Sequence, residues 1–252
     1  MNNSNSQTTV NIPNYQITET VYLGSRTLVY RAVRIDDKFP VVIKLLKRQY
    51  PTFSELVQFR NQYTIAKNLE IPGIIKPYNL EPYQNGYALV MEDFGGISLE
   101  RFTLEKPLTL EQFLLIAIQL ADTLQQLHQY GVIHKDIKPA NILIQAETLE
   151  VKLIDFSISS LLPKETPEIE NPNVLEGTLA YLSPEQTGRM NRGIDYRSDF
   201  YSLGVTFYEL LIRELPFQSS DPMELVHCHI AKASPLVHEI NSKIPFVLSE
   251  II

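Results

Sequence analysis

The residues with the clearest chemical meaning lie in one short stretch, which reads His-Lys-Asp-Ile-Lys-Pro-Ala-Asn from His134 to Asn141. Asp136 supplies a carboxylate that can accept a proton, and Lys138 supplies a positive charge close to it. Asn141 adds an amide oxygen, which is an atom type that Mg²⁺ binds. Together these three groups indicate phosphoryl transfer from a nucleotide that carries a metal ion.

A second metal ligand follows at Asp155, directly after the run Val-Lys-Leu-Ile at 151–154. The apolar, β-branched residues of this run predict a short strand that brings the Asp155 carboxylate to the same place as Asn141. Mg²⁺ takes oxygen ligands and usually keeps some of its water, so nucleotide phosphates would complete the set. We therefore predict a Mg²⁺ site at Asn141 and Asp155.

These residues resemble the catalytic motifs of the Hanks-type (eukaryotic-like) Ser/Thr protein kinases. In that family the catalytic loop reads H-R-D-x-x-x-x-N and the metal motif reads D-F-G, where this chain has Asp155-Phe156-Ser157. The resemblance implies that Asp136 accepts the proton of the substrate hydroxyl and that Lys138 neutralises the transferring phosphoryl group. A lysine at the position of Lys138 is typical of members that act on Ser or Thr. For His134 the resemblance implies a packed, structural role.

Upstream segments resemble the nucleotide-binding part of the same family. Residues 40–44, Pro-Val-Val-Ile-Lys, are similar to the V-A-I-K strand, which implies that Lys44 holds the α- and β-phosphates of ATP. Residues 88–94 are similar to the hinge, with Met91 as gatekeeper and the backbone of residues 92 and 94 facing adenine. The residues that the resemblance places around ATP are Gly24, Val29, Val42, Lys44, Met91, Glu92, Phe94 and Leu143. For the valines and the leucine, the alternative is an ordinary core position.

Two downstream segments resemble the end of the family's activation segment and the start of the helix that follows it. Residues 177–185 correspond to the first, where Thr178 is a candidate modification site and Glu185 a structural residue that usually pairs with an arginine. Residues 195–204 match the D-x-x-S-x-G pattern of the second. This match predicts that Asp199 holds the backbone of the catalytic loop.

The chain departs from the family pattern around the nucleotide. Only Gly24 of the glycine-rich loop is kept, with Tyr22 and Thr27 at the other glycine positions, so the backbone approaches the phosphates less freely. Gln62 stands at the helix position that normally carries Glu, which replaces the usual ion pair with Lys44 by a hydrogen bond to a neutral acceptor. Weak nucleotide affinity is the expected consequence.

Other departures lie in the second half of the chain. Lys135 replaces the usual Arg of the catalytic loop and Ser157 the usual Gly of the metal motif. The chain stops at Ile252, inside a region where the family usually continues with further helices and with the arginine that pairs with Glu185. Arg213 is the candidate substitute for that arginine.

Hydrophobic patterning predicts a β-rich first part and a mainly helical second part. The expected strands are 17–23, 28–35, 41–46, 76–80 and 87–91, with a hairpin turn at 84–86. The expected helices are 53–69, a second one with an apolar stripe from Leu110 through Phe113, Leu114 and Leu124 to Leu127, and an almost wholly apolar one from Phe200 to Leu211. Thr109 and Gln112 form the capping-box pattern of the second helix.

With the resemblance, these elements predict an α+β fold of the bilobal protein-kinase type. A disordered leader is expected at 1–14, a small β-rich N-lobe at 15–92, and a larger helical C-lobe, incomplete at its C-terminus, at 93–252.

The composition excludes some classes of protein. A formal net charge of -7 argues against a nucleic-acid partner, because binding to phosphate backbones needs clustered Lys and Arg. The longest apolar stretch, 113–121, is far shorter than the roughly 20 residues of a membrane span. One cysteine, Cys228, rules out an internal disulfide and fits a reducing compartment. No secretory signal pattern begins the sequence, so a cytoplasmic protein is expected.

The favoured function is an ATP- and Mg²⁺-dependent kinase that phosphorylates Ser or Thr of a protein substrate in bacterial signalling. Segments 71–78 and 188–192 also resemble the N-terminal kinase domain of large cyanobacterial multi-sensor signalling kinases, which implies further signalling domains in a longer parent chain. One alternative is a pseudokinase, which would act as a nucleotide- or partner-binding regulatory module. Another is a small-molecule kinase, against which Lys138 and segment 177–185 argue.

Overall fold

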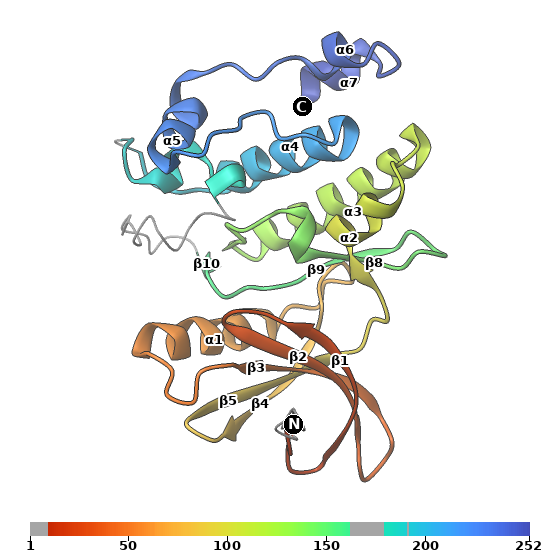
Figure 1. Cartoon of the computed structure of the whole chain (residues 1–252), viewed down its shortest axis with the longest axis vertical. Coiled ribbons are helices and arrows are strands. Elements are labelled where there is room, and N and C mark those ends of the chain that lie inside the picture. The colour runs from red at the N-terminus through yellow and green to blue at the C-terminus, as the bar shows by residue number, and fades with distance from the viewer. Residues whose placement is uncertain (1–9, 162–178, 191) are drawn as a thin grey trace, which may run out of the picture. The chain divides into compact units, whose positions relative to one another are not determined.

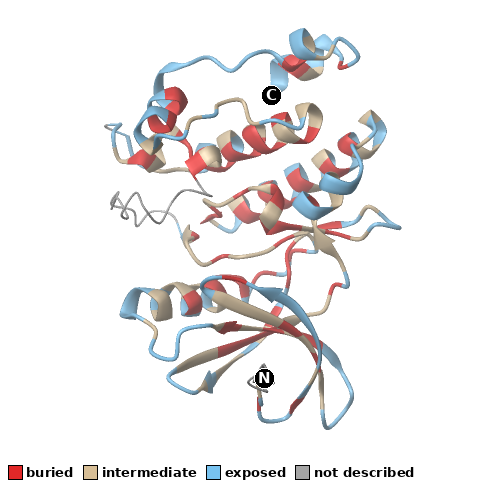
Figure 2. Cartoon of the chain, in the orientation of Figure 1, coloured by how far each residue is buried: buried red, intermediate tan, exposed pale blue. Residues whose placement is uncertain are grey.

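The computed structural model of the chain describes residues 10–161, 179–190 and 192–252. The chain divides into two compact units, one made of residues 1–67 and 76–94, the other of residues 68–75 and 95–252. Figure 1 labels many of the elements of each unit, and Figure 2 colours the residues by burial.

The first unit is an antiparallel sheet with one helix. Its five strands have the order β1-β2-β3-β5-β4. They are β1 (Tyr15–Leu23), β2 (Thr27–Arg34), β3 (Pro40–Leu46), β4 (Pro77–Tyr83) and β5 (Gly86–Glu92), and the helix α1 spans Phe53–Ala66. The strands expected from the sequence are therefore all present, with bounds that differ by a few residues.

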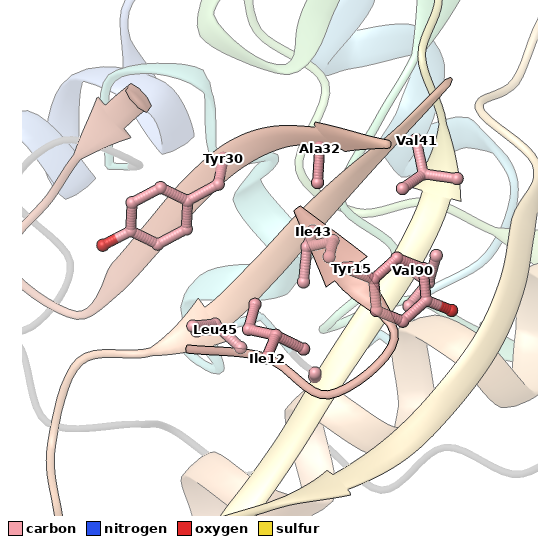
Figure 3. Close-up of a cluster of buried hydrophobic side chains, with 9 residues drawn as sticks. Ile12, Tyr15, Tyr30, Ala32, Val41, Ile43, Leu45 and Val90 are labelled. Carbon is pink, nitrogen blue, oxygen red and sulfur yellow. The ribbon is translucent and has the colours of Figure 1, made fainter. Parts of the chain in front are cut away.

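One face of this sheet carries the core of the first unit (Figure 3). In β3 the buried residues Val41, Ile43 and Leu45 alternate with partly exposed ones, as a strand with one covered face requires. The cluster on this face consists of Ile12, Tyr15, Tyr30, Ala32, Val41, Ile43, Leu45, Ala88 and Val90. Ile12 lies before β1 and is only 2% exposed, so the residues that lead into the sheet help to close its core.

Helix α1 begins with a capping box. The Thr52 hydroxyl accepts a hydrogen bond from the Glu55 backbone at 3.3 Å, and the Glu55 carboxylate accepts one from the Thr52 backbone at 2.7 Å. The Glu55 carboxylate is therefore part of the cap at the start of the helix. The helix ends at Ala66, short of the expected Leu69, because the chain turns before Pro72.

The second unit is mainly helical. Its strands are β6 (Ile97–Ser98), β8 (Ile142–Ile144) and β9 (Val151–Leu153), which form a sheet in the order β6-β8-β9, and β7 (Val132–Ile133), which pairs with β10 (Ser160–Leu161). Its α-helices are α2 (Leu99–Glu105), α3 (Leu110–Gln129), α4 (Arg197–Ile212), α5 (Pro222–Ala231), α6 (Val237–Ile240) and α7 (Phe246–Ile251). Short 3₁₀ turns are η1 (Pro139–Asn141), η3 (Leu179–Tyr181) and η4 (Pro184–Thr187).

Helices α3 and α4 form the frame of this unit and contact each other. The capping box of Thr109 and Gln112 is confirmed at the start of α3. The predicted apolar stripe is partly wrong, because Leu114 is 40% exposed whereas Ile116 and Leu120 are buried. In α4, Phe200 is 49% exposed, so that helix is not covered on all sides.

Residues 73–75 lie along β9 and fasten it to α3. The Leu153 amide donates to the Gly73 carbonyl at 2.8 Å, and the Ile75 amide donates to the Leu153 carbonyl at 3.0 Å. A Cβ at Gly73 would overlap the side chain of Thr123 on α3, so this close approach requires glycine.

Within the described parts of the chain, no helix has both the length and the apolar character to cross a membrane.

Candidate active site

Asp199 anchors the stretch that carries the candidate catalytic residues. Its carboxylate, on α4, has no exposed surface and accepts hydrogen bonds from the backbone amides of His134 at 2.9 Å and Lys135 at 2.8 Å. His128 of α3 adds a third contact, from Nε2 at 2.9 Å. A buried carboxylate is tolerated when donors surround it, so these contacts fix the loop backbone to two helices at once.

His134 joins this loop to the metal motif. Its Nδ1 accepts from the Asp136 amide at 3.3 Å, so the ring proton lies on Nε2, which donates to the Ile154 carbonyl at 3.1 Å. The ring is fully buried and packs edge-on against Phe156, with ring centroids 4.9 Å apart. The ring therefore connects the backbone of Asp136 to the backbone that leads into Asp155.

The side chains of Lys138 and Asn141 both donate hydrogen bonds to the carboxylate of Asp136. The Lys138 ammonium donates to both carboxylate oxygens of Asp136, at 2.9 Å to Oδ1 and 2.8 Å to Oδ2. The Asn141 amide nitrogen donates to Oδ2 at 2.6 Å and to the Asp136 carbonyl at 2.9 Å. The 3₁₀ turn η1, which starts at Pro139, places Asn141 within hydrogen-bond distance of Asp136.

A backbone hydrogen bond of the residue before Asp155 connects this segment to Asn141. The amide of Ile154 donates to the Asn141 carbonyl at 2.9 Å, and the Asp155 Oδ1 accepts from the Ser157 amide at 3.3 Å. Asp155 and Lys135 both have a φ of 69°. Non-glycine residues hold this left-handed conformation at an energetic cost, and it is found at functional sites that the surrounding contacts enforce.

The side chains at this place suit Mg²⁺. Because the Asn141 nitrogen is engaged by Asp136, its amide oxygen is the side-chain atom that would serve as a ligand, and the Asp155 carboxylate would be the second ligand. Both are hard oxygen donors. Among the described residues no group of three or more His, Cys, Asp and Glu side chains gathers to hold a metal.

Turn η4 is tied to the loop of residues 134–141 by a residue that sequence reasoning missed. The Gln186 side chain donates to the Lys135 carbonyl at 2.9 Å, and its oxygen accepts from the Ser183 hydroxyl at 2.9 Å. The spacing of Ser183 and Gln186 matches a capping box, which is the signal that could have found it.

Burial lowers the pKa of Lys135 to about 8, although nearby Asp199 opposes the shift.

The contact predicted for Glu185 is wrong. Its carboxylate accepts a hydrogen bond from the Ser198 hydroxyl at 2.6 Å. Arg213 instead donates to the Thr103 carbonyl, at 3.3 Å, at the end of α2. Thr178, the candidate modification site, lies outside the described residues.

The candidate ATP-binding residues of the first unit share one face of its sheet. Val29 pairs with Lys44 and Val42 pairs with Met91, and all four alternate with the buried residues of the core cluster. On this face the Lys44 ammonium donates to the Gln62 oxygen at 3.0 Å, and the Gln62 nitrogen contacts the Met91 sulfur at 3.9 Å. The sheet and α1 therefore bring these five residues together.

The other candidates occupy the ends of elements. Gly24 follows β1, and its amide donates to the Thr27 carbonyl at 2.9 Å. Glu92 ends β5, where its amide donates to the Lys76 carbonyl at 2.9 Å, and Phe94 is buried just after it. In the second unit Leu143 is partly exposed between two fully buried isoleucines of β8, so it lies on the opposite face of that strand.

An ion pair that the sequence did not reveal connects β2 to Asp93, which directly follows β5. The Arg31 guanidinium lies 3.3 Å from the Asp93 carboxylate and 2.7 Å from the Glu19 carboxylate of β1. Arg31 lies next to Val42 across the strands, on the face that holds Lys44. The two carboxylates therefore fix one edge of the candidate nucleotide-binding face.

Comparison with known proteins decides the family. The profile of the protein kinase domain matches residues 15–249. The chain belongs to the protein kinase family. The predicted α+β fold, with a β-rich N-lobe and a helical C-lobe, is thereby confirmed.

The chain is similar to bacterial proteins that are named serine/threonine kinases. A probable serine/threonine-protein kinase of Clostridium perfringens is 32% identical over 241 residues, which cover 94% of this chain and 34% of that protein. The serine/threonine-protein kinase PrkC of Bacillus subtilis is 32% identical over 242 residues, with 94% and 36% covered. The chain thus spans about a third of the length of these relatives.

A eukaryotic relative has a different name. The hybrid signal transduction histidine kinase G of Dictyostelium discoideum is 34% identical over 207 residues, which cover 56% of this chain and 6% of that protein.

Proposed function

We propose that this protein transfers the γ-phosphoryl group of ATP to a Ser or Thr hydroxyl of a protein substrate. The observation that carries the proposal is the convergence of Lys138 and Asn141 on the Asp136 carboxylate, one residue after a backbone fixed by Asp199. Phosphoryl transfer depends on positioning and charge neutralisation, which this rigid loop supplies.

Asp136 is the proton acceptor in this proposal. Its Oδ2 accepts from both Lys138 and Asn141, whereas Oδ1 accepts from Lys138, so Oδ1 is the less engaged oxygen for the substrate hydroxyl. Lys138 stays close enough to offset the negative charge that develops on the transferring group. The two neighbours also orient the carboxylate before substrate arrives, which lowers the cost of reaching the reactive geometry.

Asn141 and Asp155 would hold Mg²⁺ through their side-chain oxygens. When bound, the ion neutralises charge on the phosphates of ATP. In the first unit Lys44, oriented by Gln62, would contact the α- and β-phosphates, and the apolar side chains of Val29, Val42 and Met91 would line the adenine side. Gly24, Glu92 and Phe94 of the first unit stay proposed nucleotide contacts, and so does Leu143 of the second unit.

A pseudokinase, which would bind nucleotide or a partner without catalysis, is the second candidate. Gln62 in place of a glutamate and the glycine-poor turn at Gly24 favour it. The presence of Lys44, Asp136, Lys138, Asn141 and Asp155 together favours an active enzyme.

We also propose a cytoplasmic location and a longer parent chain with further signalling domains. The cytoplasm supplies ATP, and the buried, unpaired thiol of Cys228 fits a reducing compartment. The limited share of each relative that the chain spans, and the hybrid histidine kinase among those relatives, support additional domains.

Transfer of label from ATP to a generic Ser/Thr protein substrate in Mg²⁺ tests the proposed activity. Loss of a general base typically costs about 10²- to 10⁴-fold in rate, so Asp136→Asn should nearly abolish transfer while nucleotide binding persists. Asp122→Asn makes the same change on an exposed part of α3 and should leave the rate unaltered. Equal label from wild type, Asp136→Asn, Lys44→Ala and Asp155→Ala would refute an active kinase.

A further inference from the structure

The turn between β1 and β2 has few glycines, yet it is a tight one. The Gly24 amide donates to the Thr27 carbonyl at 2.9 Å, which closes the turn over Ser25 and Arg26. None of residues 22–27 has a positive φ. The Tyr22 ring lies where a Cβ on Gly24 would be, so it packs directly against the turn. The turn therefore holds an ordinary backbone conformation and does not use glycine freedom.

Lys47, the first residue after β3, fastens this turn from the neighbouring strand. Its backbone amide donates to the Arg26 carbonyl at 2.8 Å, and its side-chain ammonium donates to the Gly24 carbonyl at 3.1 Å. One residue thus binds carbonyl oxygens at two points of a four-residue turn. The guanidinium of the next residue, Arg48, does not join the turn in this way but forms an ion pair with the Glu55 carboxylate of α1, at 3.6 Å.

Binding of the Gly24 carbonyl has a consequence for the amide that follows. In a trans peptide the carbonyl oxygen and the next N–H point in opposite directions. With its carbonyl held by Lys47, the Gly24–Ser25 peptide directs the Ser25 N–H away from the ammonium. Backbone N–H groups of turns are donors for phosphate oxygens.

We propose that Lys47 is a positioning residue for nucleotide binding, which holds the β1–β2 turn in the orientation that presents the Ser25 amide to a phosphate. This inference rests on the proposed binding of ATP by the first unit. Lys47 replaces the missing glycines by fixing one peptide orientation, where a glycine-rich loop would adapt to the ligand.

The proposal predicts an effect on binding and not on the chemical step. Lys47→Met keeps the alkyl chain and the backbone contact but removes the donor to Gly24. One hydrogen bond of this kind should weaken Mg·ATP binding about two- to tenfold, measured as Kd by calorimetry and as KM, with kcat within about twofold of wild type. Lys47→Arg, which keeps a donor, should recover most of the affinity.

Arg48→Met is the matched control, because it removes the same charge from the adjacent residue without touching the turn. It should leave Kd within about twofold of wild type. Equal weakening by Lys47→Met and Arg48→Met would overturn the proposal, since the effect would then come from charge alone. Unchanged Kd in Lys47→Met would overturn it as well.

Amide hydrogen exchange without nucleotide separates this proposal from the proposed catalysis. Lys47→Met should speed exchange at Gly24, whose amide closes the turn, by about the same factor as it weakens binding, while the amides of α1 stay unchanged. If Gly24 exchange speeds up and nucleotide binding weakens but no variant, wild type included, transfers phosphate, the positioning role stands and the proposed activity fails. Exchange at Gly24 that equals wild type refutes the positioning role.

Discussion

The ammonium of Lys44 donates a 3.0 Å hydrogen bond to the amide oxygen of Gln62, across the space between β3 and α1. Gln62 is 5% exposed and its amide nitrogen contacts the Met91 sulfur, so the side chain is held at both ends. The sequence predicts this neutral contact in place of an ion pair. Substitutions that replace the amide of residue 62 by a carboxylate or by an apolar group measure what this hydrogen bond contributes.

Gln62→Glu should strengthen the hold on Lys44, because hydrogen bonds between charged groups are roughly twice as strong as neutral ones. We expect kcat/KM for ATP to stay the same or rise by up to about threefold, whereas Gln62→Leu should lower it about tenfold. Gln58→Glu adds the same charge one turn earlier in α1 and serves as control. A Gln62→Leu enzyme as active as wild type would show that the contact has no role in activity.

Removal of the charge from Asp199 should unfold the loop that carries Asp136. In Asp199→Asn the carboxamide turns one NH₂ group toward donors, so at least one buried amide of His134 or Lys135 loses its acceptor. We expect a loss of about 2–4 kcal/mol in the free energy of unfolding, measured by urea denaturation. The exposed Asp122→Asn should change it by less than about 0.5 kcal/mol. Similar small changes in both variants would contradict the anchoring role.

The close approach of Gly73 to Thr123 predicts a steric effect with a rescue. Gly73→Ala places a methyl group on the Thr123 side chain and should cost about 1–3 kcal/mol of stability. Adding Thr123→Ala removes the overlapping hydroxyl and methyl and should restore part of the loss. A double-mutant cycle by thermal denaturation measures the coupling.

Gly193→Ala is the matched control for that cycle, because a Cβ there meets no atom within 4 Å. It should be neutral or slightly stabilising, as the added side chain restricts the unfolded chain. Strict additivity of Gly73→Ala and Thr123→Ala would argue against the contact.

The lowered pKa of Lys135 predicts how stability changes with pH. Burial favours the neutral amine in the folded state, with a pKa of about 8 against an ordinary 10.5, so between these values the unfolded chain binds more protons. Stability then rises with pH across this window, and the full destabilisation from the charged, buried amine is present below pH 8.

The difference in unfolding free energy between wild type and Lys135→Met isolates this effect, because the tyrosines that also titrate at high pH are common to both. From pH 7.5 to 10.5 wild type should gain stability relative to the variant. Parallel curves would show that Lys135 titrates at its ordinary pKa in the folded protein.

Local patterns in the sequence predict local structure well in this protein. The capping box at Thr109 and the strand before Asp155 depend on residues only a few positions apart, whose geometry follows from backbone and side-chain chemistry. Burial is less predictable. Leu114 and Phe200 are apolar but exposed, because periodicity shows which residues share a face and not which neighbour covers that face.

The sequence by itself determined the chemical groups and their local order: a carboxylate, an ammonium and an amide between Asp136 and Asn141, followed by a strand and a second carboxylate. Only the tertiary structure decided the contacts between distant residues that no sequence pattern indicated, such as Gln186 with Lys135, Ser198 with Glu185 and Arg31 with Asp93. Covalent spacing restricts neighbours within a few residues. Residues far apart in the chain meet only where apolar faces such as those of α3 and α4 pack together, and each polar group then bonds to the partner that this packing leaves within reach.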